Sequence, residues 1–220
     1  GYTYTLDAAT ADSGSSQGVT WSDFKNINDT TGTVNFQTGG SLTGNLSAQT
    51  LNYSSYTQDL TLNASTGAIT NSGVTGTLTL NGTKTVNGNA GQSNTVTGTG
   101  LTYTLANGTP DAGSANGYAW SNFKHITDLG VGTINFNASG SVSGNLTSTT
   151  TTGTLNYGSY GSAVTYKLGG AAGSTGITGT NSGFATITGN NAQSNTITGS
   201  GATYLLDAAL ADKGSSGGSS

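Results

Sequence analysis

The stretch TVNFQTGGSLTGNLSAQTLNY, residues 33–53, alternates short runs of strand-forming residues with Gly, Ser, Thr and Asn. Its apolar centres, Val34, Leu42 and Leu51, are eight and nine residues apart. The same spacing continues at Leu60, Ile69, Leu78, Val86, Val96 and Leu105. Such short strands, separated by turn residues at near-even intervals, predict an all-β fold in which each cycle of about nine residues holds one strand and one turn.

The chain repeats this stretch about 100 residues later. Residues 133–157 read TINFNASGSVSGNLTSTTTTGTLNY, a copy of residues 33–53 with four extra residues near 148–152. We expect a surface loop there, because loops tolerate insertions. We divide the chain into a first unit at 1–100, a second unit at 101–200, the start of a third at 201–212 and a flexible Gly/Ser tail at 213–220.

Two architectures fit this spacing. In a β-solenoid, or parallel β-helix, two cycles make a coil of about 18 residues, or three make a larger one, and the coils stack along an axis. In the alternative, each unit is an antiparallel β-sandwich, whose strands recur at similar intervals. We favour the solenoid because large apolar residues are few, Pro occurs once, and Asn, Thr and Ser recur beside the turns, where stacked copies can form ladders.

Charge is sparse: 6% of the residues are charged, the net charge is -4, and Cys, Met, Glu and Arg are absent. Without a basic stripe, nucleic acid is not expected as a partner. No apolar stretch approaches the roughly 20 residues of a membrane span, so membrane insertion is not expected. His125 is the only imidazole, its counterpart in the first unit is Asn26, and no catalytic or cofactor-binding motif is present. We expect neither an enzyme nor a cofactor.

Asp12, Asp111 and Asp212 recur at equivalent positions of the three units. Carboxyl groups placed in this way commonly cap turns or face solvent, and we expect that role. An isolated calcium site is the alternative, which makes the three residues weak metal candidates, although no metal is expected for the chain as a whole.

Two clusters of large apolar residues share a spacing of three: Trp21, Phe24 and Ile27 in the first unit, and Trp120, Phe123 and Ile126 in the second. This spacing indicates a short helical turn or a wide loop that gathers the side chains on one side. We expect a plug over the core of each unit. Alternatively, Trp21 and Trp120 form aromatic platforms that bind a ligand such as a glycan.

Three phrases, TLNYSSY at 50–56, LNYGSY at 155–160 and SNTVTG at 93–98, resemble the β-strand repeats of very large bacterial secreted and surface proteins. That group includes filamentous-haemagglutinin-like adhesins, autotransporter stalks and repeats-in-toxin exoproteins. The resemblance implies a rod-like, non-enzymatic protein that is secreted or displayed on the bacterial cell surface. The calcium-binding turn Gly-Gly-x-Gly-x-Asp of the repeats-in-toxin group is replaced here by GQSN at 91–94, so the resemblance to that group is degenerate and a calcium ladder is not expected.

The two ends of the chain are near copies, GYTYTLDAATAD at 1–12 and GATYLLDAALAD at 201–212. A solenoid exposes strand edges at its ends unless they are capped, and what receives one of these segments can receive the other. We therefore expect head-to-tail association with copies of itself. The assembly candidates are Tyr4, Leu6, Tyr204 and Leu206. The alternatives are a module that binds a glycan or a cell surface, and an ice-binding solenoid, because Thr-x-Thr pairs recur in the expected strands.

Overall fold

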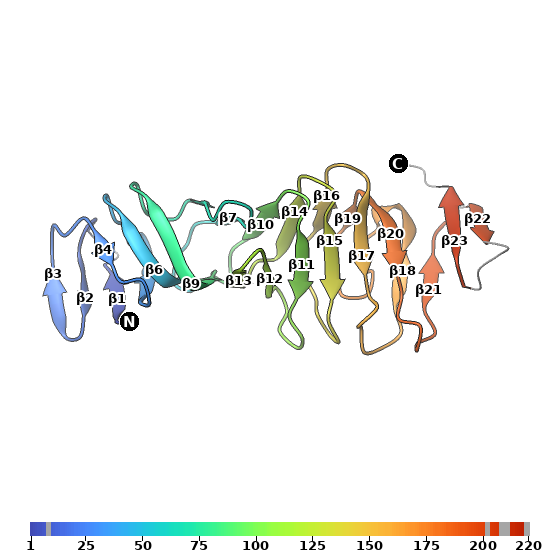
Figure 1. Cartoon of the computed structure of the whole chain (residues 1–220), viewed down its shortest axis with the longest axis horizontal. Coiled ribbons are helices and arrows are strands. Elements are labelled where there is room, and N and C mark those ends of the chain that lie inside the picture. Colours follow the sequence, from blue (N-terminus) through green and yellow to red (C-terminus); the bar gives the residue numbers. More distant parts are fainter. Residues whose placement is uncertain (8–9, 201–202, 207–211, 218–220) are drawn as a thin grey trace.

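The computed structural model is an elongated β-solenoid of about six turns, with the first unit at one end and the second unit at the other (Figure 1). The structure describes residues 1–7, 10–200, 203–206 and 212–217. Within them the regular structure is β, apart from one 3-10 helix, η1 (Leu168–Gly170). The predicted solenoid is confirmed. The alternative of two antiparallel sandwiches is wrong, because strands of successive coils pair in parallel.

The largest sheet has 13 strands and runs through both units. Its strand order is β20-β17-β15-β11-β12-β13-β9-β6-β5-β1-β2-β3, and β4 joins it by pairing with β6. The strands of the first unit are β1 (Thr3–Leu6), β2 (Gly14–Ser16), β3 (Val19–Trp21), β4 (Ile27–Asn28), β5 (Thr33–Phe36), β6 (Leu46–Asn52) and β9 (Leu78–Asn87). Those of the second unit are β11 (Thr102–Leu105), β12 (Gly113–Ala115), β13 (Tyr118–Ser121), β15 (Thr133–Phe136), β17 (Gly153–Asn156) and β20 (Phe184–Thr188).

A second sheet has six strands in the order β19-β16-β14-β10-β7-β8. They are β7 (Thr61–Asn63), β8 (Ile69–Thr70), β10 (Thr95–Gly98), β14 (His125–Asp128), β16 (Leu146–Ser148) and β19 (Asn181–Ser182). Two pairs complete the fold, β18 (Thr165–Lys167) with β21 (Thr196–Thr198), and β22 (Thr203–Leu206) with β23 (Gly214–Gly217). Strand β23 falls in the segment for which we expected a flexible tail. Residues 201–202, 207–211 and 218–220 of the third unit and tail lie outside the described residues.

The coils differ in length. Asn35 and Asn52, which stack in adjacent coils, are 17 residues apart, whereas Ser47 and Asn81 are 34 apart. The expected coil of about 18 residues therefore describes only the shortest turns, and the longer ones hold about four of the nine-residue cycles. This difference explains why the chain makes about six turns.

The core fills the inside of the coils. In β5, Val34 and Phe36 are buried while the alternate residues face outward, as the two-residue period of a strand requires. Val34, Leu51 and Val86 lie in register in three stacked coils. Burying a side chain of this size contributes about 1.5–3 kcal/mol, so the stack of coils supplies the folding energy.

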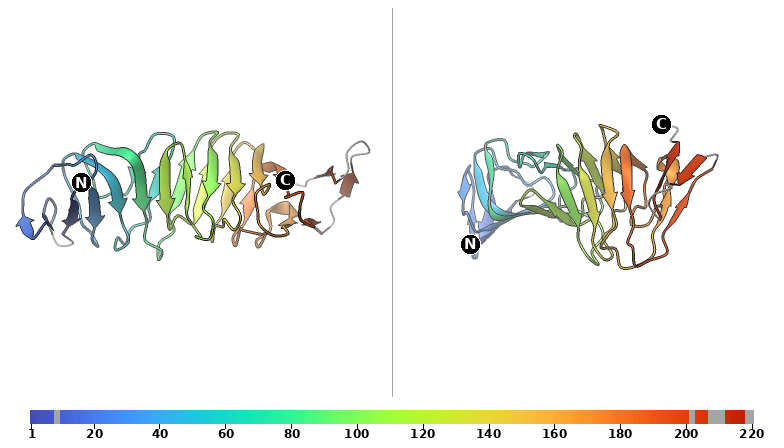
Figure 2. Two further views of the ribbon diagram at one scale, coloured as in Figure 1. Left: turned by 60° about the horizontal axis from the view of Figure 1, so that its bottom comes forward. Right: turned by 45° about the vertical axis from the view of Figure 1, so that its right-hand side comes forward.

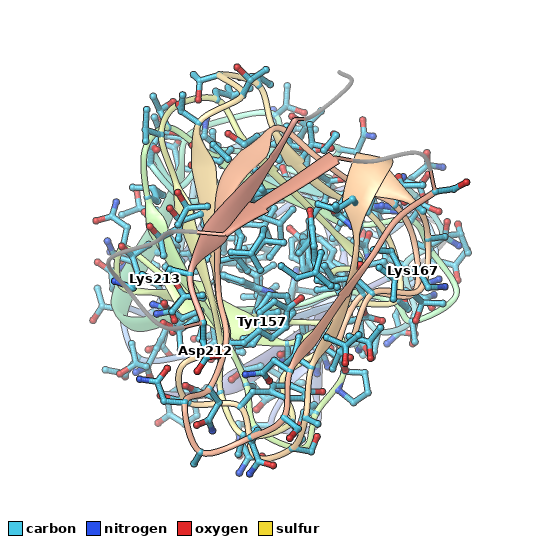
Figure 3. All side chains as sticks on the ribbon, turned by 90° about the vertical axis from the view of Figure 1, so that its right-hand side faces the viewer. Tyr157, Lys167, Asp212 and Lys213 are labelled. Atoms are coloured by element: carbon cyan, nitrogen blue, oxygen red, sulfur yellow. The ribbon has the colours of Figure 1, made fainter. Side chains whose placement is uncertain are left out.

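Aromatic rings stack inside each unit. The rings of Phe36 and Tyr53 lie 4.3 Å apart, and those of Phe136 and Tyr157 lie 4.2 Å apart. The view along the axis in Figure 3 shows Tyr157 inside the coil and Lys167 at its periphery. On the outside, Nδ2 of Asn52 donates to Oδ1 of Asn35 at 2.9 Å, and Asn156 and Asn135 repeat this contact at 2.9 Å. The predicted Asn ladders are therefore confirmed.

Each unit opens with three antiparallel strands, β1-β2-β3 in the first and β11-β12-β13 in the second, and we call each set a meander. The turn between β12 and β13 is Asn116-Gly117, with positive φ angles of 48° and 79°, as a two-residue hairpin of type I′ requires. The meander of the second unit lies between the two parallel stacks and joins them into one rod, which both views in Figure 2 show.

The predicted surface loop is also present. Strand β6 is continuous in the first unit, whereas its counterpart in the second unit is divided into β16 and β17. Residues 149–152 between them are exposed. The four extra residues of the second unit therefore leave the stacked strands on both sides in place.

Candidate functional site

The two units meet at what we call the junction, which continues both sheets from one unit to the next. In the large sheet, β13 lies parallel to β9, with Trp120 opposite Val86. In the second sheet, β14 lies parallel to β10, with Ile126 opposite Val96. All four side chains are buried, so the junction has the character of a core.

A buried amide links the strands of the junction. Oδ1 of Asn94 accepts a hydrogen bond from the amide of Leu60 at 2.9 Å. Its Nδ2 donates to the carbonyl oxygens of Asn89 at 3.0 Å and Asn122 at 2.8 Å. Asn122 in turn donates from Nδ2 to the carbonyl oxygen of Gly88 at 3.0 Å. Both amide protons of Asn94 are thus used, as expected for a buried polar side chain. Sequence reasoning missed this role, although the recurrence of Ser-Asn at 93–94 and 194–195 was a signal for it.

The Trp clusters do not form helical turns. Trp21 ends β3 and Ile27 begins β4, so of the two predicted forms, a short helical turn and a wide loop, the structure has the wide loop, which carries Phe24. In the second unit, Trp120 and Phe123 are buried in the junction and form the predicted plug. A buried ring is not presented to a ligand in solvent, which argues against Trp120 as a glycan platform. Trp21 is only partly buried. The indole N–H groups of both Trp residues are buried and have no hydrogen-bond partner in the described part of the chain.

Asp12 and Asp111 each hold the next coil through two hydrogen bonds. The amide and hydroxyl of Thr43 donate to Oδ1 and Oδ2 of Asp12, both at 2.6 Å. Ser143 donates to Asp111 in the same way, at 2.6 and 2.7 Å. The Thr43 hydroxyl and then its amide hold the pKa of the Asp12 carboxyl below its usual value, because both bonds favour the charged form.

Asp212 has the same backbone conformation as Asp12 and Asp111: the φ angles are 59° at Asp12, 58° at Asp111 and 59° at Asp212. The left-handed region suits Asp better than most residues. Among the described residues, no three His or Asp side chains gather into a group that could hold a metal ion. The arrangement at Asp12 and Asp111 is therefore that of a turn-capping carboxyl group.

His125 and its counterpart in the first unit, Asn26, accept the same hydrogen bond. Its Nδ1 accepts from the amide of Asn145 at 2.9 Å. In the first unit, Oδ1 of Asn26 accepts from the amide of Asn45 at 2.7 Å. Both side chains supply an acceptor to the same turn, which explains in physical terms why His and Asn replace each other here.

Asp128 is a buried carboxyl group with four donors around it. Oδ1 accepts from the amides of Gly100 at 3.0 Å and Gly130 at 2.8 Å, and Oδ2 accepts from the amide of Leu101 at 3.1 Å and the hydroxyl of Tyr103 at 2.8 Å. Burial, and then the bond to Asp128, raise the pKa of the Tyr103 hydroxyl. These bonds tie the end of β14 to residues 100–101 and to Tyr103 in β11, so Asp128 fixes the start of the second meander, as Asp29 does in the first unit through Tyr2 and Tyr4.

Of the assembly candidates, Tyr4 and Leu6 do not lie on an exposed strand edge, where we expected them. Tyr4 and Leu6 lie in β1, which is paired on both sides, with β2 and β5, and Leu6 is fully buried. Tyr204 and Leu206 lie in β22, and their side chains lie outside the described residues. The strand with an unpaired outer edge in the first meander is β3, which the sequence analysis did not single out.

The outer face of the large sheet is polar and shallow. Rows of Thr run beside rows of Asn, as at Thr33 and Asn35 followed by Thr50 and Asn52 in register. Thr3 and Thr5, one of the Thr-x-Thr pairs that suggested ice binding, lie opposite Thr33 and Asn35, so this pair is part of a mixed Thr and Asn surface. A hollow of about 230 Å³ lies in this face, and its lining is Thr104, Asn135, Phe136, Asn137, Asn156 and Ser159. It contains no acid or base.

In the described part of the chain, no helix has the length and apolar character needed to cross a membrane. The chain matches no family model, no curated protein and no solved structure.

Proposed function

We propose that the chain is a non-enzymatic structural protein, a rod-like stalk or fibre segment of a bacterial surface adhesin that works outside the cell. The observation that carries the proposal is the junction. Twelve strands follow one another without interruption from β3 to β20 in the large sheet, across both units. Such a stack transmits force and sets a distance, because main-chain hydrogen bonds along the axis connect every coil to the next.

The use of the polar side chains supports a structural role. Asp12, Asp111 and Asp128 direct their carboxyl oxygens to hydrogen-bond donors of neighbouring coils, and His125 accepts from a backbone amide. A general acid or base must instead reach a substrate. The extracellular placement rests on the resemblance of the sequence to repeats of secreted bacterial proteins.

Duplication of a unit lengthens such a rod in fixed steps. The second unit contributes six strands to the large sheet, β13-β12-β11-β15-β17-β20. At about 4.8 Å between strands, one unit adds about 30 Å along the axis. A stalk built in this way gains reach by gaining copies, while its cross-section stays constant.

The test is a variant with one additional copy of residues 101–200 inserted between Ser200 and Gly201. Small-angle scattering at low concentration should show a maximum dimension longer by about 30 Å and an unchanged cross-sectional radius. A larger cross-section at unchanged length would contradict the rod. Antibodies against the chain should also label intact cells of the organism that encodes it, and labelling only after cell lysis would contradict the extracellular role.

A further inference from the structure

The two ends of the rod carry strands equivalent to those that pair at the junction. At the first end, β3 corresponds to β13 and β4 to β14; at the other end, β20 corresponds to β9 and β21 to β10. Within the described residues, β3 pairs only with β2, β4 only with β6, β20 only with β17 and β21 only with β18. Each end therefore presents one side of a contact that the chain itself forms between its two units.

Apolar side chains at the two ends of the rod are exposed, whereas their counterparts at the junction are buried. At the first end, Val19 is 65% exposed and Phe24 is 64% exposed, whereas their junction counterparts Tyr118 and Phe123 are 7% and 0% exposed. At the other end, Ile197 is 56% exposed, whereas its counterpart Val96 is fully buried. Val19, Phe24 and Ile197 are thus exposed at positions whose counterparts in the junction are buried. Exposed apolar side chains at such positions mark an interaction surface.

The polar contacts show the same difference. Asn195 repeats two of the bonds of Asn94: its Oδ1 accepts from the amide of Val164 at 3.1 Å, and its Nδ2 donates to the carbonyl oxygen of Asn190 at 2.8 Å. The third bond of Asn94, from Nδ2 to Asn122 across the junction, has no counterpart among the described residues, and Asn195 is exposed. The residue equivalent to Asn122 is Asp23, in the loop after β3.

We propose that the first end of one copy docks on the other end of a second copy and reproduces the junction, with β3 parallel to β20 and β4 parallel to β21. This inference rests on the proposed rod and names its partner, a second copy of this chain. The junction register of Lys84 with Tyr118 and of Val86 with Trp120 sets Ala185 opposite Val19, and Ile187 opposite Trp21. Such a heterologous contact does not close on itself and produces a filament.

The contact uses the folded units and not the terminal segments. The docking copy brings its own meander, β1-β2-β3, so β22 and β23, which repeat β1 and β2, are not part of the contact. The amide of Asn195 would donate to the carbonyl oxygen of Asp23, as Asn94 does to Asn122. The Asp23 side chain, unlike that of Asn122, has no N–H to donate to the carbonyl oxygen of Gly189, the counterpart of Gly88. The contact between copies is therefore weaker than the internal junction.

Cysteine cross-linking tests the register, because the chain has no Cys. The test mixes full-length Val19→Cys with full-length Ala185→Cys under mild oxidation. At the junction the counterparts of these side chains are in contact, since Lys84 Nζ lies 4.5 Å from the centre of the Tyr118 ring. We expect a disulfide-linked heterodimer in the mixture, little product from either variant alone, and none when Thr149→Cys, an exposed position in the loop between β16 and β17 and outside the end strand β20, replaces Ala185→Cys. Equal linking of Val19→Cys to itself, or no linking in the mixture, would overturn the proposal.

A matched pair of surface variants tests the apolar contact. Phe24 and Val131 are exposed to a similar degree, 64% and 63%, but only Phe24 lies at an end. We expect Phe24→Asp to raise the concentration needed for association at least tenfold and Val131→Asp to leave it unchanged, with both variants folded by circular dichroism. Asp23→Asn should lower that concentration. Equal effects of Phe24→Asp and Val131→Asp would overturn the proposal, whereas rods that remain long and monomeric in scattering would leave the proposed function standing.

Discussion

Replacing Asp128 by Asn is expected to destabilise the start of the second unit, next to the junction, by about 2–4 kcal/mol. The carboxyl group is 1% exposed and accepts four hydrogen bonds, two at each oxygen. An amide keeps one acceptor and turns the other into a donor. If Nδ2 takes the place of Oδ2, the Tyr103 hydroxyl can rotate and accept from it, but the amide of Leu101 loses its partner. An orphaned buried donor costs about 1–3 kcal/mol, and the remaining bonds lose their charge.

Amide hydrogen exchange is the appropriate assay, because a stacked array can open locally before it unfolds. A loss of 2–4 kcal/mol corresponds to a roughly 30-fold or larger loss of protection at Gly100, Leu101 and Gly130. Asp29→Asn is the matched control, since Asp29 accepts from Tyr2 and Tyr4 in the first unit but is open to water, which can replace the lost acceptor. Similar small effects of both substitutions would refute the assigned role of Asp128.

Three further outcomes are expected. His125→Asn should leave the midpoint of thermal unfolding unchanged. His125→Ala should lower the free energy of unfolding by about 0.5–1.5 kcal/mol, because the amide of Asn145 loses its acceptor. Equal midpoints for the two variants would contradict the role given to His125. The pKa of Asp12 is lower in the folded than in the unfolded chain, so its bonds to Thr43 stabilise the fold above about pH 4 and this stabilisation is lost as the pH falls through the folded pKa. Asp12→Asn should therefore weaken the fall in stability that acid causes in the unsubstituted chain. An unchanged dependence of stability on acid pH would count against the contact. Insertion of Gly-Ser-Gly into the loop at 149–152 should leave the circular dichroism spectrum and midpoint unchanged, whereas the same insertion inside β5 should lower the midpoint, because it shifts the register of Val34.

The sequence predicted the elements that repeat locally. Apolar residues such as Val34, Leu51 and Val86 mark strand centres because the inside of a coil admits large side chains only at alternate positions of a strand. The Asn35 and Asn52 ladder and the loop at 149–152 follow from the same local pattern. The nine-residue spacing does not say how many strands complete a coil, since that number depends on how sharply each turn bends the chain. The sequence therefore left the coil length open between two cycles and a larger coil, and the structure contains coils of 17 and of 34 residues.

The candidate site was predicted less well, because it depends on contacts between distant segments. The sequence predicts Trp120 as part of a plug and, alternatively, as a ligand platform, and the stacking of β13 on β9 distinguishes the two by burying the ring. Asp12 and Asp111 were predicted as turn residues, and they are, because the left-handed backbone that Asp tolerates is a local property. Their partners, Thr43 and Ser143, lie 31 and 32 residues away and could not be predicted in the same way. Asn94 makes its bond to Asn122 only when the second unit lies on the first, so nothing in its immediate sequence context distinguishes it. Asp128 and its counterpart Asp29 bond residues 25–27 positions earlier in the chain, and the sequence does not show that the chain returns there.

Negative-stain electron microscopy of the purified chain over a range of concentrations tests whether the two units form one continuous rod. We expect single rods of constant width at low concentration, about 60 Å long for twelve strands in the large sheet. As the concentration rises, the rods should join end to end without widening. Two linked globular particles, or rods that associate side by side, would contradict this expectation.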